Sequence, residues 1–94
     1  METRKLKGMP YAQAKVIIDE YGAITLVSYT TEVITIDPQG WLTCTGTYSQ
    51  TTRKHISSFM KEYTKLTYQH AKDAFLNNYT LNIYTGEIEH LGEG

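Results

Sequence analysis

Apolar residues recur along the chain with two different periods, and each period predicts a different kind of element. Near the N-terminus the spacing i, i+3, i+4, i+7 of one helical face is met. The residues at this spacing are Ala14, Ile17, Ile18 and Tyr21. Pro10 suits a first helical turn and Gly22 suits a left-handed cap, so the pattern predicts a helix over residues 10–21. The β-branched run at residues 16–18 also allows a strand.

The next segment is rich in β-branched residues, which favours strands over residues 23–37. Its apolar side chains alternate on one parity and then, from Ile34 onward, on the other. A change of parity means either a β-bulge or a tight turn near Thr30–Thr31, so the segment is one bent strand or two. The residues Asp37–Gly40 carry Pro and Gly at positions typical of a turn, and residues 41–48 alternate as the returning strand.

Two amphipathic segments predict further helices. The first begins after Ser49, whose hydroxyl can cap a helix N-terminus. Its apolar stripe consists of Ile56, Phe59, Met60 and Tyr63. The second begins after Thr67 and ends at Asn77–Asn78. Its stripe consists of Ala71, Ala74, Phe75 and Asn78.

The C-terminal part reads as a second hairpin. Residues 79–84 and residues 87–91 flank a turn at Thr85–Gly86. Together the elements predict a single α+β domain over residues 1–94, in which residues 1–8 are flexible. We expect an antiparallel sheet of about four to five strands, built from two hairpins and covered on one face by about three helices.

Composition narrows the classes of function. The formal net charge is −1, which argues against binding nucleic acid by overall charge and leaves a local basic patch open. Positive charge gathers near the N-terminus at Arg4, Lys5 and Lys7, and negative charge near the C-terminus at Glu87, Glu89 and Glu93. The simpler interpretation is that both clusters are solvated chain ends of opposite charge.

A single cysteine, Cys44, cannot form an internal disulfide, and its strand position predicts a small buried core residue. No apolar run approaches the roughly 18 residues of a membrane span, and the N-terminus lacks the apolar stretch of a signal peptide. These observations predict a cytoplasmic protein with no membrane partner.

Eight tyrosines stand out in a chain of 94 residues. Strands can absorb several of them, because tyrosine fits half-buried sheet positions. Tyr11, Tyr68 and Tyr84 fall outside the predicted stripes. These three are candidates for stacking on nucleic-acid bases or for anchoring a protein interface.

The start of the helix after Ser49 is the strongest candidate site. Free N–H groups, hydroxyls and cations meet there, as an anion-binding site requires. The candidate anion- or partner-binding residues are Tyr48, Ser49, Thr51, Thr52, Arg53, Lys54, His55 and Lys61. Cations at a helix N-terminus oppose the helix dipole, and such a local misfit sometimes marks function. The competing interpretation is a capped helix with a solvated basic first turn.

Catalysis and metal binding find little support in the residue spacing. The histidines His55, His70 and His90, taken with Cys44, show none of the short spacings typical of zinc sites. No phosphate-binding glycine loop is present, and nothing in the spacing pairs a nucleophile with a base. We therefore expect no metal, no cofactor and no enzymatic activity.

Two stretches carry a recognisable pattern. The first is Ser-Tyr-x-Thr-x-Val, matched by Ser28, Tyr29, Thr31 and Val33. The second is Tyr-Ser-x-Thr-Thr-x-Lys-His-Ile, matched by Tyr48, Ser49, Thr51, Thr52, Lys54, His55 and Ile56. In both, the chain resembles a family of small uncharacterised proteins that are common in bacteriophages and mobile elements. The resemblance covers about a third of the chain and implies a phage or prophage context, without an activity to transfer.

Two functions follow as expectations. The first is an accessory or counter-defence protein that binds and blocks a host protein or ribonucleoprotein in the host cytoplasm; an anti-CRISPR-type inhibitor is its most concrete form. The alternative is a small nucleic-acid-binding module that uses Arg53, Lys54, Lys61 and Tyr48.

Overall fold

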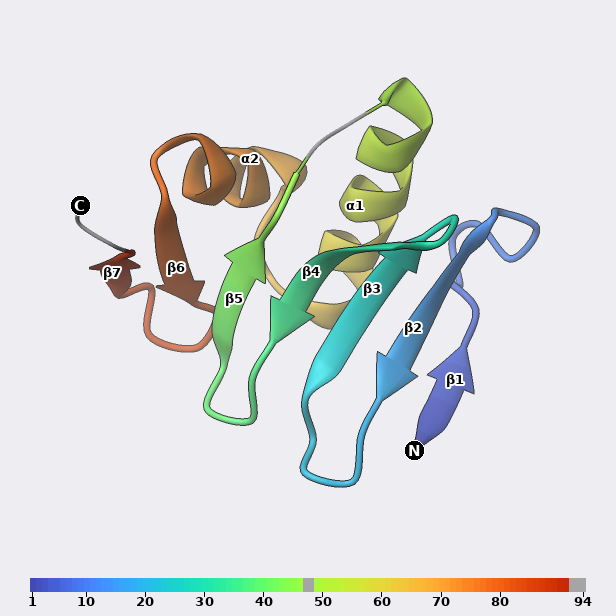
Figure 1. The fold of residues 1–94 in the computed structure, drawn as a ribbon, viewed down its shortest axis with the longest axis horizontal. Helices are drawn as coiled ribbons and strands as arrows, with labels where there is room; N and C mark the ends of the chain where they lie inside the picture. The colour runs from blue at the N-terminus through green and yellow to red at the C-terminus, as the bar shows by residue number, and fades with distance from the viewer. Residues whose placement is uncertain (47–48, 92–94) are drawn as a thin grey trace.

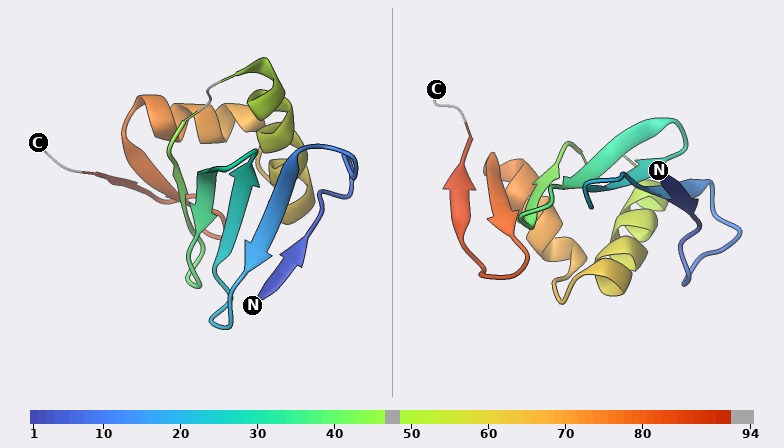
Figure 2. Two further views of the ribbon diagram at one scale, coloured as in Figure 1. Left: turned by 45° about the vertical axis from the view of Figure 1, so that its right-hand side comes forward. Right: turned by 90° about the horizontal axis from the view of Figure 1, so that it is seen from below.

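An antiparallel sheet forms one layer of the protein, and two helices cover one of its faces (Figures 1 and 2). This computed structural model describes residues 1–46 and 49–91. Its seven strands are β1 (Glu2–Arg4), β2 (Ala14–Ile18), β3 (Ile24–Ser28), β4 (Thr31–Ile36), β5 (Trp41–Cys44), β6 (Tyr79–Asn82) and β7 (Ile88–His90). Each strand pairs with its neighbour in sequence, and both helices, α1 (Gln50–Tyr63) and α2 (Tyr68–Leu76), lie between β5 and β6.

The expected sheet of about four to five strands under about three helices is wrong, although the broad α+β class holds. The predicted helix over residues 10–21 is instead strand β2, which pairs with β1 and β3. The β-branched run at residues 16–18 prefers the extended backbone, and Val16 is fully buried by it. Tyr21, assigned to the helical stripe, is 76% exposed in the turn after β2. The other added strand, β1, pairs along the free edge of β2.

Strands β3 and β4 contain both a tight turn and a bulge. Ser28 pairs with Thr31 across the turn formed by Tyr29 and Thr30. The register then shifts between Leu26 and Val27, because Val33 is the extra residue on β4. The segment is therefore two strands, and the bulge accounts for the change of parity that the sequence shows.

The core lies between the sheet and α1. Rows of side chains in register across the strands face the helices, among them the row Val16, Leu26, Ile34 and Cys44. Ile56, Phe59 and Met60 of α1 are fully buried against them, which confirms the predicted stripe. The core position of Cys44 is also confirmed, and burial raises the pKa of its thiol. The opposite face of the sheet carries the half-buried row Ile17, Thr25, Thr35 and Thr43.

Both helices begin at the residues that the sequence predicts. Ser49 is the N-cap of α1, and its hydroxyl accepts a hydrogen bond from the backbone N–H of Thr52 at 3.1 Å. Thr67 begins α2, where His70 completes a capping box. In the part of the chain that the structure describes, no helix is both long and apolar enough to span a bilayer.

Candidate functional site

Helix α1 divides the predicted site between its two faces. Thr52 and His55 turn toward the sheet and are 4% and 0% exposed. The cationic side chains Arg53, Lys54 and Lys61 turn outward and are exposed. Thr51 and the cap Ser49 are also exposed, whereas Tyr48 lies outside the described residues. The predicted residues therefore form two separate arrangements, one buried and one on the surface.

The buried arrangement is a chain of hydroxyl groups that ends on a histidine. Ser49 Oγ donates to Thr52 Oγ1 at 3.1 Å, and Thr52 Oγ1 lies 3.1 Å from Ser28 Oγ. Ser28 Oγ in turn lies 2.8 Å from His55 Nδ1. Ser28 comes from β3 and is 2% exposed. Ser28 was not among the predicted site residues, although its place in the Ser-Tyr-x-Thr-x-Val pattern was a signal that could have identified it.

Two links of this chain can run in either direction. Either hydroxyl of the Thr52–Ser28 pair can donate, and the role of His55 Nδ1 toward Ser28 depends on the tautomer of the ring. The Nε2 atom of His55 is buried and has no hydrogen-bond partner among the described residues. Burial lowers the pKa of His55, which agrees with a neutral ring.

Tyr29 stands next to this chain in an unusual backbone conformation. Its φ of +58° is in the left-handed region, which a bulky residue rarely adopts. The ring centroids of Tyr29 and His55 are 5.7 Å apart, at an interplanar angle of 50°. The backbone N–H of Tyr29 also donates to the Gln13 carbonyl at 2.7 Å. The strained turn is thus held from two sides, over the histidine and against residue 13.

The Ser28–His55 contact has the atoms of a nucleophile and a base, but its surroundings suit a structural role. Both side chains are buried, and no carboxylate in the described part of the chain hydrogen-bonds the His55 ring. The remaining histidines are engaged elsewhere: His70 caps α2, and the His90 ring meets Tyr79. Within residues 1–46 and 49–91, no three His, Cys, Asp or Glu side chains gather as a metal site. The buried chain therefore ties the start of α1 to the β3–β4 turn.

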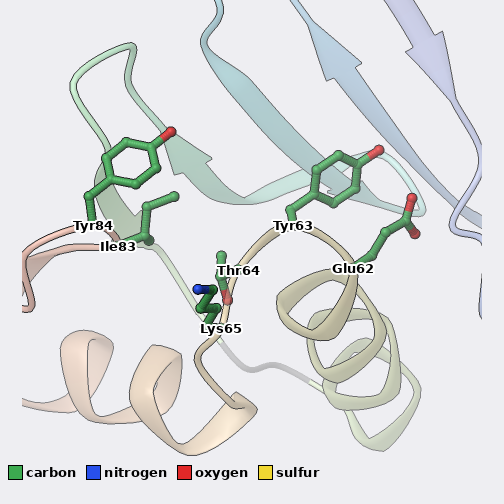
Figure 3. A pocket seen from close by; sticks show the side chains of 6 residues that line it. All are labelled: Glu62, Tyr63, Thr64, Lys65, Ile83 and Tyr84. Carbon is green, nitrogen blue, oxygen red and sulfur yellow. The ribbon is translucent and has the colours of Figure 1, made fainter.

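The surface arrangement contains three hollows, two between the outward face of α1 and the start of α2 and one at the C-terminal end of α1. The first is lined by Gln50, Arg53, Lys54, Ser57 and Tyr68. The second is lined by Ser57, Lys61, Thr64, Lys65, Leu66, Thr67 and Tyr68. The third, shown in Figure 3, is lined by Glu62, Tyr63, Thr64, Lys65, Ile83 and Tyr84.

These hollows adjoin one another, because consecutive ones share lining residues. Ser57 and Tyr68 line the first and second, and Thr64 and Lys65 line the second and third. We call the whole surface the basic groove. The 14 residues of α1 alone span about 21 Å of it at 1.5 Å per residue.

Cations predominate in the first two hollows of the basic groove, and the third is lined by one lysine and one glutamate. The cations of the groove are Arg53, Lys54, Lys61 and Lys65. The one ion pair within the described residues joins Arg4 to Glu2, so these four cations form none there. Glu62, the acidic residue of the lining, accepts a hydrogen bond from the backbone N–H of Lys7 at 2.8 Å. The groove therefore carries four cations against one carboxylate, and none of the four forms an ion pair within the described residues.

Aromatic side chains lie between the cations of the groove. The Arg53 guanidinium lies 5.1 Å from the centroid of the Tyr68 ring, within cation–π range. Tyr84 and Tyr63 line the far end. Two of the three tyrosines that the sequence singled out thus belong to the groove, whereas Tyr11 is 96% exposed on the loop before β2.

The charge distribution is unfavourable for the helix itself. No acidic residue stands in the first turn of α1, where it would complement the dipole. Arg53 and Lys54 stand near the helix start and oppose the dipole, whereas Lys61 in the last turn complements it. A helix surface that retains cations in such an unfavourable position is a candidate for binding a negatively charged partner.

Comparison with known proteins gives a family match. Residues 2–84 match the family of unknown function DUF8033. Neither the search of curated proteins nor that of solved structures gave a match.

Proposed function

The chain belongs to the family of unknown function DUF8033, and we propose that it is a binding protein that holds single-stranded nucleic acid in the basic groove. The observation that carries this proposal is the set of adjoining hollows, whose linings combine four cations with the tyrosines Tyr63, Tyr68 and Tyr84. Proteins that hold single strands combine these two features, because cations follow the phosphates and aromatic rings stack on bases.

The positive charge of the groove favours binding of a polyanion. Four cations lie along one face of a chain whose net charge is −1, so the positive field is local and directed. Each cation that neutralises a phosphate releases counterions, which makes binding favourable at low salt. The acidic residues near the C-terminus, Glu87 and Glu89, lie on or beside β7 and outside the lining of the groove.

The placement of the aromatic rings favours a single strand over a duplex. Tyr68 at the start of α2 and Tyr84 after β6 each line a hollow on the surface. Bases inside a duplex are stacked on one another, whereas unpaired bases can turn outward and stack on protein rings. A duplex would reach the cations without using the tyrosines.

Fluorescence anisotropy with a labelled 12-nucleotide strand tests the proposal, using DNA and RNA in separate arms. The double variant Arg53→Ala/Lys54→Ala should lose most of the binding seen at about 50 mM salt. The matched control is Lys5→Ala/Lys15→Ala, which removes the same charge from exposed positions outside the groove. No binding by the unaltered protein, or equal loss in both double variants, would contradict the proposal.

The resemblance to phage proteins favours a particular source for the bound strand. We propose that the bound strand belongs to a host ribonucleoprotein, which the protein blocks as a counter-defence factor, in its most concrete form an anti-CRISPR-type inhibitor. Capture from host lysate, with and without nuclease, tests this step. Retention that nuclease abolishes supports it. Retention that neither nuclease nor Arg53→Ala/Lys54→Ala affects would point instead to a protein contact outside the groove.

A further inference from the structure

The far end of the basic groove differs from the rest, because two aromatic rings define it. In Figure 3 the side chains of Tyr84 and Tyr63 stand on either side of the third hollow, with Thr64 and Lys65 between them. The hollow measures about 380 Å³. Pockets that take small organic groups begin at about 300 Å³, so the volume suits a compact ring system.

Tyr84 is exposed and yet held in place. Its side chain is 76% exposed, and one side of its ring lies against Gly40, where an added Cβ would collide with the ring carbons. The backbone N–H of Tyr84 donates to Asn82 Oδ1 at 2.9 Å. Asn82 is itself buried, and its amide donates to the Gln39 carbonyl at 3.2 Å. The backbone of residue 84 is thus held in place, and its ring rests on Gly40 as a platform with its outer surface exposed.

Tyr63 forms the opposite wall and is fixed from behind. Its ring stacks on the buried Phe59, with centroids 5.0 Å apart and planes at 29°. Burial of the hydroxyl group raises the pKa of the Tyr63 phenol. Ile83 supplies apolar surface between the walls, and Lys65 supplies a cation at the side where the groove continues.

We propose that this hollow is a slot for one unpaired nucleobase, which stacks on Tyr84 while Lys65 holds its phosphate. The inference rests on the proposed function and adds where a base, rather than only the phosphate backbone, is held. Rigid aromatic walls lose little conformational entropy on binding. The slot is independent of sequence, because every base has a π-face.

The test compares two strands and two exposed tyrosines. The strands are a 12-nucleotide DNA and the same DNA with abasic sites throughout. The variants are Tyr84→Ala and its matched control Tyr21→Ala, since Tyr21 is also 76% exposed but lies in the β2–β3 turn. Tyr84→Ala should weaken binding of the base-containing strand roughly 5- to 150-fold, the range for losing one stacked base. Tyr84→Phe should retain binding, and Tyr21→Ala should have no effect.

Further outcomes separate the slot from the groove. Tyr84→Ala should leave abasic-strand binding unchanged, because the phosphate contacts remain. Equal binding of the base-containing strand by Tyr84→Ala and the unaltered protein overturns the slot and leaves the proposed function standing. Failure of the unaltered protein to bind either strand overturns the proposed function. Adenosine monophosphate that perturbs the Tyr84 resonances, without strand binding, would support a slot for free nucleotides and overturn the strand interpretation.

Discussion

Ser28 on β3 and His55 on α1 are separated by 27 positions in the chain, and their side chains meet with Ser28 Oγ 2.8 Å from His55 Nδ1. The contact brings together the two sequence patterns that contain these residues. Tyr29 and Thr52 belong to the same two patterns and contact the same pair. These four residues therefore form one structural unit, which ties the start of α1, where the first cations of the basic groove lie, to the β3–β4 turn.

Removing the Ser28 hydroxyl should destabilise the protein. Ser28→Ala leaves Thr52 Oγ1 and His55 Nδ1 buried without their shared partner, which costs about 1–3 kcal/mol. Urea unfolding followed by circular dichroism measures the change. Thr25→Ala, on the same strand but on the half-exposed opposite face, is the control and should change stability far less. Equal effects of the two substitutions would mean that the hydroxyl chain contributes nothing special.

The buried histidine should make stability fall at acid pH. The folded state lowers the pKa of His55, so between the ordinary pKa of about 6.5 and the lowered one the unfolded chain binds a proton that the folded chain does not. Stability is therefore fully present above about 6.5 and decreases as the pH falls toward the folded pKa. The free energy of unfolding, measured at several pH values for the unaltered protein and for His55→Gln, checks this. A His55→Gln variant with the same slope between pH 5 and 7 would contradict the assignment.

Glycine at position 40 should be required for two separable reasons. Gly40 and Gly22 have φ values of +96° and +92°, so an alanine at either position costs about 1–2 kcal/mol from backbone strain. Gly22 has open space around its Cα, whereas a Cβ at position 40 meets the Tyr84 ring. Gly40→Ala should therefore destabilise the protein more than Gly22→Ala.

A double variant isolates the contact between Gly40 and Tyr84. In Gly40→Ala/Tyr84→Ala the ring that meets the new methyl group is gone, so the cost should fall back toward that of Gly22→Ala. Urea unfolding of Gly22→Ala, Gly40→Ala, Tyr84→Ala and the double variant gives the comparison. If Gly40→Ala and Gly22→Ala destabilise equally, the Tyr84 ring does not rest on Gly40, and the fixed platform is wrong.

Local signals predicted those parts of the fold that depend on neighbouring residues. The turn at residues 37–40, the Ser49 cap and the α1 stripe are all decided within a few positions, and the structure agrees with each. The prediction of a helix over residues 10–21 was wrong because Ala14 and Ile18 fit both a helical stripe and the alternation of a strand. Pairing with β3, where Val16 lies opposite Leu26, selects the strand. A local sequence pattern carries no information about this pairing.

The candidate site was predictable in part for the same reason. The cations of α1 were identified because they are consecutive or helically spaced. Lys65 and Tyr68 were not connected to them, since the groove arises only where α2 packs beside α1. Likewise, Ser28 reaches His55 only through the packing of α1 on β3. Tertiary approach, rather than residue type, assembles both arrangements.

The salt dependence of single-strand binding tests the central claim most directly. If the four cations of the groove contact three to four phosphates, the plot of log K against log salt should have a slope of about −2 to −3. Arg53→Ala/Lys54→Ala should make that slope shallower by about 1.4, while Lys5→Ala/Lys15→Ala leaves it unchanged. A slope near zero, or one that both double variants alter equally, would show that the basic groove does not hold the strand.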